Sequence, residues 1–181
     1  MAWWYYQTKN LKLNDSQKKA AVTELLGHAQ RQEVVVPQGD QSYSNQYYSI
    51  SYPKAATEYH QDPTYSPPPS QLSYFAFQEM SPRLFFTVSV MSRPGQSLTD
   101  ITGVSFRQKQ PSLYNQSLIT EDGVSGLVFT RDKPVSDDNP DLEKTAFFVK
   151  DDRVYTFSLT GSDIDEINKM FDSVINSLKF N

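Results

Sequence analysis

The strongest constraint on the fold lies at the C-terminal end of the sequence. Large apolar residues recur there at intervals of three and four: Ile164, Ile167, Phe171, Val174, Ile175 and Leu178. This spacing predicts a helix with one apolar face, which must be buried against another element. Gly161 ends the preceding strand pattern, Ser162 is the expected N-cap, and the carboxylates that follow suit the first turn of a helix. A helix packed on a β-sheet is therefore expected.

The residues before this helix have the pattern of a series of antiparallel hairpins. The expected strand pairs cover 72–79 with 84–92, 116–122 with 124–131, and the two halves of 145–160. Short connections of this kind join antiparallel neighbours. Asp122 and Gly123 form one turn, Asp151 and Asp152 another. The last strand places Tyr155, Phe157 and Leu159 on one face.

Three further segments complete the expected domain. Residues 47–53 alternate, with Tyr48, Ile50 and Tyr52 on one face, and predict a strand that Pro53 ends. Residues 61–70 hold four prolines and predict a loop. Residues 97–106 predict a short helix. The fold class is thus α+β, an antiparallel sheet of about six or seven strands covered by helices.

The N-terminal part predicts a different organisation. Residues 14–31 have helical spacing, and residues 33–46 are rich in the polar and turn-forming residues of a linker. We therefore expect an aromatic and basic segment over 1–13, a helix and polar linker over 14–46, and the α+β domain over 47–181. Cutting the chain after Thr160 should remove cooperative melting.

The chain opens with four consecutive aromatic residues, Trp3, Trp4, Tyr5 and Tyr6, followed by basic and amide residues. Trp and Tyr gather at the membrane–water boundary, where spanning helices end. We interpret them as membrane-interface residues at the end of an anchor that precedes this sequence. The alternatives are rings docked on the domain's own surface or a disordered start. No apolar run here is long enough to span a bilayer or form a signal peptide.

Composition excludes several classes of function. The net charge is −4, with no clustered Lys and Arg, so we expect no nucleic acid as partner. The chain has no cysteine, which excludes disulfides, thiolate metal sites and Cys nucleophiles. Its 11 Phe and 11 Tyr supply a large aromatic core.

The order of these elements resembles that of the PsbP-like family over roughly residues 46–180. The resemblance rests on the opening "YSISYP", the central hairpins, the short middle helix, the last hairpin and a closing helix that ends in "INSLKF". Family members commonly carry a Gly-Trp pair after the first strand's proline, whereas Lys54, Ala55 and Ala56 follow Pro53 here. The resemblance implies a helix-covered antiparallel sheet without catalytic activity, exported, often lipid- or helix-anchored, that binds other proteins or assists assembly.

Candidate catalytic residues are few. His60 with Asp62 has the residue types of a hydrolase, but we interpret the pair as a surface loop beside an Asp-Pro turn. His28 lies on the N-terminal helix without a partner. Ser125 in "GVSGL" lacks the nucleophile-elbow spacing and is interpreted as a strand residue. No cofactor is expected.

One acidic loop has the ligand types of a calcium site. Asp137, Asp138 and Asp141, with Asn139, offer hard oxygen donors, but the EF-hand order is absent and Pro140 interrupts. We therefore expect a solvated loop, and the prolines 67–69 are interpreted as a rigid loop.

Three functions follow from the sequence. The first is a non-enzymatic interaction domain, tethered to a membrane and displayed outside the cytoplasm, with a protein as partner. The second is a small-molecule or lipid carrier with an apolar pocket between sheet and helix. A hydrolase centred on His60 is a distant third.

Overall fold

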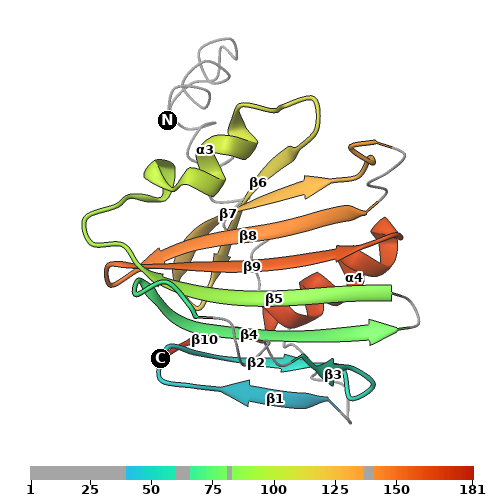
Figure 1. Cartoon of the computed structure of the whole chain (residues 1–181), viewed down its shortest axis with the longest axis horizontal. Helices are drawn as coiled ribbons and strands as arrows, with labels where there is room; N and C mark the ends of the chain where they lie inside the picture. Colours follow the sequence, from blue (N-terminus) through green and yellow to red (C-terminus); the bar gives the residue numbers. More distant parts are fainter. Residues whose placement is uncertain (1–39, 60–65, 81–82, 137–140) are drawn as a thin grey trace, which may run out of the picture. The chain divides into compact units, whose positions relative to one another are not determined.

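A computed structural model describes residues 40–59, 66–80, 83–136 and 141–181 (Figure 1). These residues form two antiparallel sheets and two α-helices, labelled as in Figure 1. The N-terminal rings at 3–6 and the expected helix at 14–31 lie outside the described residues. No helix of the part described has the length and apolar character needed to cross a membrane.

The larger sheet has seven strands in the order β3-β4-β5-β9-β8-β7-β6, all antiparallel. The strands are β3 (Thr57–Glu58), β4 (Gln71–Met80), β5 (Arg83–Ser92), β6 (Asn115–Glu121), β7 (Val124–Arg131), β8 (Leu142–Lys150) and β9 (Arg153–Gly161). Six of them pair as the three hairpins that the sequence predicts, β4 with β5, β6 with β7 and β8 with β9. The expected fold class is therefore confirmed.

Two of these hairpins close on residues with positive φ. Asp122 and Gly123 have φ of 48° and 79°, and Asp151 and Asp152 have 52° and 59°. Two consecutive positive φ values are the signature of the two-residue turn whose twist matches that of the flanking strands. The turn positions predicted from the sequence are thus confirmed, although the second turn uses two aspartates where glycine is usual.

A second, three-stranded sheet corrects the expectation that one sheet contains every strand. It has the order β1-β2-β10, from β1 (Gln41–Ser44), β2 (Tyr48–Tyr52) and β10 (Lys179–Phe180). It packs on β4 through rings: Tyr52 stacks on Phe77 with centroids 5.0 Å apart. The "YSISYP" strand therefore belongs to this small sheet.

Strand β1 lies within the stretch that the sequence assigns to the linker. Its composition is polar because only alternate side chains touch the domain. Tyr43 stacks on Phe75 with centroids 3.9 Å apart, and the Gln41 amide donates to the carbonyls of Lys54 and Ala56. These contacts are tertiary, so local composition does not reveal them.

Helix α4 (Ile164–Asn176) is the predicted C-terminal helix. Its apolar face, which includes Phe171 and Val174, is buried against the large sheet and β2. The N-cap is Asp163, not Ser162: its carboxylate accepts the backbone N–H groups of Asp165 and Glu166. The helix also ends earlier than "INSLKF" suggests, because Lys179 and Phe180 leave it to pair with β2.

The two faces of the large sheet are covered differently. Helix α4 and the small sheet lie on one face, where aromatic side chains from both layers form the main core. On the opposite face lie the 3-10 turn η1 (Leu98–Asp100) and helix α3 (Thr102–Gln108), which confirm the short helix expected over 97–106. Helices on both faces of one antiparallel sheet are the expected sandwich.

Candidate functional site

The candidate site lies on the α3 face of the sheet. Helix α3 packs on a small second core there, formed by Ile101, Val104, Leu127, Phe129, Phe147 and Val154. Gly103 permits this close contact, since a Cβ at that position would meet the Phe147 ring at 2.8 Å. The helix is thereby held against β7 and β8, and its Arg107 reaches the polar residues of the sheet.

Beside this core, five residues form a polar cluster, in which Arg131, Glu143 and Thr145 are buried and Arg107 and Tyr114 are half-buried. One Glu143 oxygen accepts the Arg107 guanidinium and, at 2.7 Å, the Thr145 hydroxyl. The other accepts the Tyr114 hydroxyl at 3.2 Å and lies 3.9 Å from Arg131 Nε. Arg131 also donates to the Asp141 carbonyl at 2.7 Å. The cluster thus ties α3, the segment after it, β7 and β8 together.

The surroundings of Glu143 favour the ionised form of its side chain. Burial alone raises the pKa of this group, but the hydrogen bond from Thr145 and the charge and hydrogen bond of Arg107 outweigh it, so the pKa lies below its ordinary value. At Tyr114 burial and the neighbouring Glu143 charge raise the pKa of the hydroxyl. At neutral pH the Glu143 side chain is therefore ionised and the Tyr114 hydroxyl keeps its proton.

This arrangement is suited to holding structure. A general base needs a lone pair directed at a substrate proton and a pKa near the working pH. Both Glu143 oxygens already accept hydrogen bonds, and the pKa of the group is lowered. The cluster as built therefore offers no free base, and it serves to lock α3 onto the sheet.

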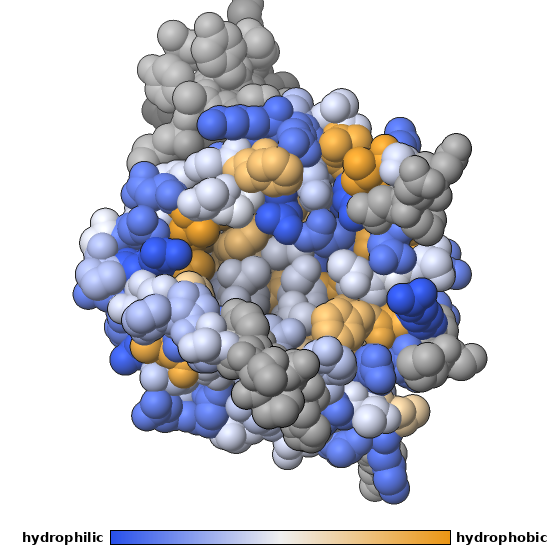
Figure 2. Space-filling model, in the orientation of Figure 1, coloured by the Kyte–Doolittle hydropathy of each residue, from blue (hydrophilic) through white to orange (hydrophobic). Residues whose placement is uncertain are grey.

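The rest of this face is lined by hydroxyl groups. Thr87, Ser158 and Thr145 stand opposite one another across β5, β9 and β8. The hydroxyls of Thr145 and Ser158 lie 2.8 Å apart. Thr87 and Ser158 are half-buried, as is Phe85 in the next row. Figure 2 views this face and shows residues of intermediate hydropathy in its middle, with both hydrophobic and hydrophilic residues around them.

Most of the site residues considered from the sequence lie outside the part of the chain that the structure describes. His28, His60 and Asp62, the acidic-loop residues 137–139 and the four N-terminal aromatic residues lie outside the described residues. Ser125 is an exposed residue of β7, as the strand interpretation predicts. Asp141 is described, and its backbone carbonyl accepts Arg131. Within the described ranges no His, Asp and Glu side chains group as metal ligands.

The polar cluster is not predicted from the sequence, because its members lie far apart along the chain. A signal was nevertheless present in the alternation of the strands. In β7, Arg131 shares its face with Phe129, and in β8, Glu143 shares its face with Phe147. A charged residue on an otherwise apolar face predicts a buried partner of opposite charge. The register places these two charged residues directly opposite each other.

The space between sheet and α4, where a carrier would hold its ligand, is occupied by core side chains. Phe157 lies edge-on to Tyr48 and Phe148, with centroids 5.9 and 5.8 Å apart. Phe171 and Val174 of α4 are fully buried in the same cluster. No observation on these residues favours the carrier function over the interaction function.

The domain is similar in fold to the solution structure of cyanobacterial PsbP (CyanoP) from Synechocystis sp. PCC 6803. The two share 19% sequence identity with a TM-score of 0.59, over 81% of this chain and 95% of the other. The PsbP-like resemblance drawn from the order of elements is thereby confirmed at the level of the fold.

Two other solved structures match less well. A crystal structure from Bacteroides thetaiotaomicron VPI-5482 has a TM-score of 0.41 and 13% identity, over 80% of this chain and 49% of that one. A protein of unknown function from Pseudomonas aeruginosa has a TM-score of 0.33 and 12% identity, over 70% and 85%. Comparison by sequence finds no matching protein family and no matching curated protein.

Proposed function

We propose that this chain is a non-enzymatic interaction or assembly domain that acts outside the cytoplasm, is tethered to a membrane from its N-terminal side, and binds another protein. The observation that supports this most is the fold it shares with cyanobacterial PsbP over 81% of its length. The PsbP-like resemblance implies an exported, non-catalytic binding domain, and the shared fold makes the same role the best proposal here.

The polar cluster supports the non-enzymatic part of the proposal. Its one carboxylate is held by three hydrogen-bond donors, and its pKa is lowered. A group in this state neither takes a proton at neutral pH nor attacks a substrate. What the cluster provides is a rigid α3 face, and a rigid surface is what a binding domain needs, because little ordering remains to be done when the partner arrives.

The proposed contact surface is the part of the α3 face that β5 and β9 form. It presents half-buried hydroxyls of Thr87, Ser89 and Thr156 beside the Phe85 ring. Tyr59 lies edge-on to Phe85 at 5.5 Å between centroids and is itself exposed. Aromatic rings among small hydroxyl residues resemble the contact surfaces of adaptable protein binders.

The location is tested by fractionating cells that make the full-length gene product at its native level. We expect the domain in the membrane fraction, released from it only by detergent, and degraded when protease is added to cells with a permeable outer layer but an intact cytoplasmic membrane. A product found in the soluble cytoplasmic fraction, protected from that protease, would overturn the tether and the location together.

A further inference from the structure

Strand β6 is one edge of the seven-stranded sheet and, among the residues that the structure describes, pairs only with β7. A two-residue turn joins the strands, so its flanking residues, Glu121 and Val124, form a hydrogen-bonded pair. Because the pattern alternates, the backbone groups of Ser117 and Ile119 also point to β7. Those of Gln116, Leu118 and Thr120 point outward, and no turn or loop of the described residues supplies them with a backbone partner.

This edge lacks the features with which proteins usually protect an edge strand. Exposed edges are normally interrupted by proline, by a β-bulge or by charged residues, especially lysine. Asn115–Glu121 contains no proline, lysine or arginine, and it pairs with β7 over seven consecutive residues without a bulge. Leu118, at its centre, is 80% exposed. By contrast the opposite edge, β3, is only two residues long.

The sequence of β6 is complementary to itself when reversed. Antiparallel pairing about a two-fold axis at Leu118 sets Leu118 against its own copy, Gln116 against Thr120, and Asn115 against Glu121. The single charged residue of the strand thus meets an amide that can donate to it, and no like charges are opposed. The residues paired across the axis, 116, 118 and 120, are also those whose backbone groups point outward.

We propose that two copies of this chain associate through β6, so that their seven-stranded sheets join edge to edge in a two-fold symmetric dimer. The outward groups of Gln116, Leu118 and Thr120 hydrogen-bond to those of the partner copy. The two Leu118 side chains, on the same face of the joined sheet, cover each other. This interface is isologous and closes at two copies. It is independent of the partner binding proposed above, which uses β5 and β9.

Sedimentation equilibrium of the full chain across the micromolar range measures this association. We expect a mass that rises from 20.7 kDa toward twice that value with concentration. Leu118→Lys places two like charges together and removes two buried leucines, so the dimer should weaken by about 100-fold or more. The matched control is Val135→Lys, an exposed apolar residue outside β6, which should leave the association unchanged.

Mixing variants with opposite charges at position 118 tests directly whether the two copies meet at the two-fold axis. Leu118→Lys and Leu118→Glu should each be monomeric alone, whereas their equimolar mixture should form a dimer, since the axis then pairs opposite charges. Hydrogen exchange should slow at the amides of Gln116, Leu118 and Thr120 as the wild type associates. A wild type that stays monomeric throughout, a Leu118→Lys variant that still dimerises, or a mixture that stays monomeric would each overturn the proposal.

Discussion

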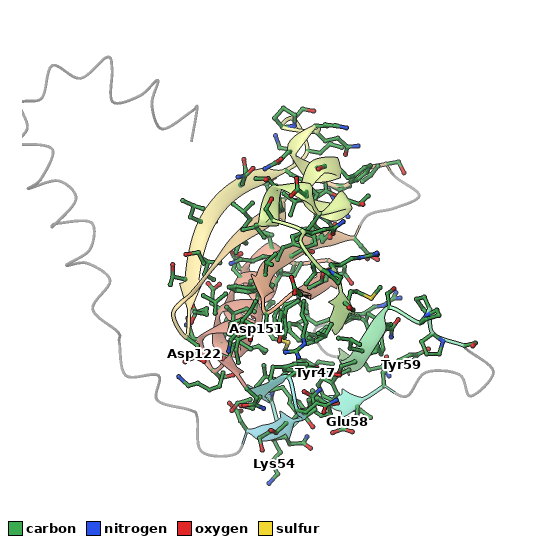
Figure 3. The ribbon with its side chains drawn as sticks, turned by 90° about the vertical axis from the view of Figure 1, so that its left-hand side faces the viewer. Tyr47, Lys54, Glu58, Tyr59, Asp122 and Asp151 are labelled. Carbon is green, nitrogen blue, oxygen red and sulfur yellow. The ribbon has the colours of Figure 1, made fainter. Side chains whose placement is uncertain are left out.

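Three aspartates with positive φ allow turn strain to be separated from tertiary contacts. Asp122, Asp151 and Asp152 adopt a left-handed conformation that costs an L-residue about 1 to 2 kcal/mol and glycine almost nothing. Figure 3 labels Asp122 and Asp151 at the turns of neighbouring hairpins. Replacing each by glycine relieves the same backbone strain, so differences among the variants report what each carboxylate does elsewhere.

The three carboxylates differ in the number of contacts that they make. No hydrogen bond or ion pair of the Asp151 carboxylate is found among the described residues, and Asp152 accepts the Gly95 N–H at 3.0 Å. Asp122 accepts the Phe180 N–H at 3.0 Å and lies 3.9 Å from the Lys179 ammonium, which fixes β10 in the small sheet. The Lys179 pair is largely exposed and contributes little.

These contacts set an order of stability. Glycine also adds freedom to the unfolded chain, so relief of strain alone leaves a gain of about 0.5 to 1 kcal/mol for Asp151→Gly. A lost hydrogen bond costs about 0.5 to 1.5 kcal/mol, which leaves Asp152→Gly near the wild type. The bond from Phe180 to Asp122 is partly buried, whereas the bond from Gly95 to Asp152 is exposed, so losing it costs more, about 1.5 kcal/mol, and Asp122→Gly should be destabilised by about 0.5 to 1 kcal/mol.

Urea unfolding followed by far-UV circular dichroism measures the three differences at constant m-value. Asp152→Asn is the control: it keeps an oxygen for the Gly95 N–H and tolerates the left-handed conformation, so it should match or exceed the wild type. If Asp151→Gly were less stable than the wild type, or if Asp122→Gly were the most stable of the three, the reasoning from turn strain and anchoring would be refuted.

Three further predictions concern the cluster, the core and the buried hydroxyls. Glu143→Gln should destabilise the fold by about 3 kcal/mol at pH 7 because it leaves the buried Arg131 and the half-buried Arg107 without a counter-charge. Since the pKa of Glu143 is lowered by folding, the wild type should lose this stability as pH falls below the ordinary value of 4.5, and the variant should show a flatter curve of urea midpoint against pH. Phe171→Ala should cost about 3 to 5 kcal/mol in the same assay, since that ring is fully buried. Burial raises the pKa of Tyr48, Tyr52 and Tyr155, that of Tyr52 to about 12. Absorbance at alkaline pH should therefore show these three ionising only as the protein unfolds, with stability falling above pH 10, where the unfolded chain's tyrosines lose their protons.

The parts of the fold that follow from neighbouring residues could be predicted from the sequence. Asp122-Gly123 sets a turn by its own conformational preference, and the spacing of Ile167, Phe171 and Val174 sets a helix face. Hairpins and the closing helix depend on contacts between residues near each other in the chain, and these were placed correctly.

The parts that depend on distant contacts were not predicted. Strand β1 is held in place because Tyr43 stacks on Phe75. Lys179 and Phe180 leave the helical pattern because they pair with the edge of β2 as strand β10. The polar cluster likewise joins Arg107 to Glu143 across 36 positions. In each case the stabilising partner is fixed by sheet register, which single-sequence periodicity does not determine.

Photo-crosslinking in living cells tests whether the part of the α3 face formed by β5 and β9 binds a partner protein. A benzophenone amino acid is placed at Thr87 on that face and, as the matched control, at Lys169, an exposed residue of α4 on the opposite side of the sheet. We expect a discrete adduct with one protein of the membrane fraction from position 87 and none from position 169. Equal adducts from both positions, or none from position 87, would contradict it.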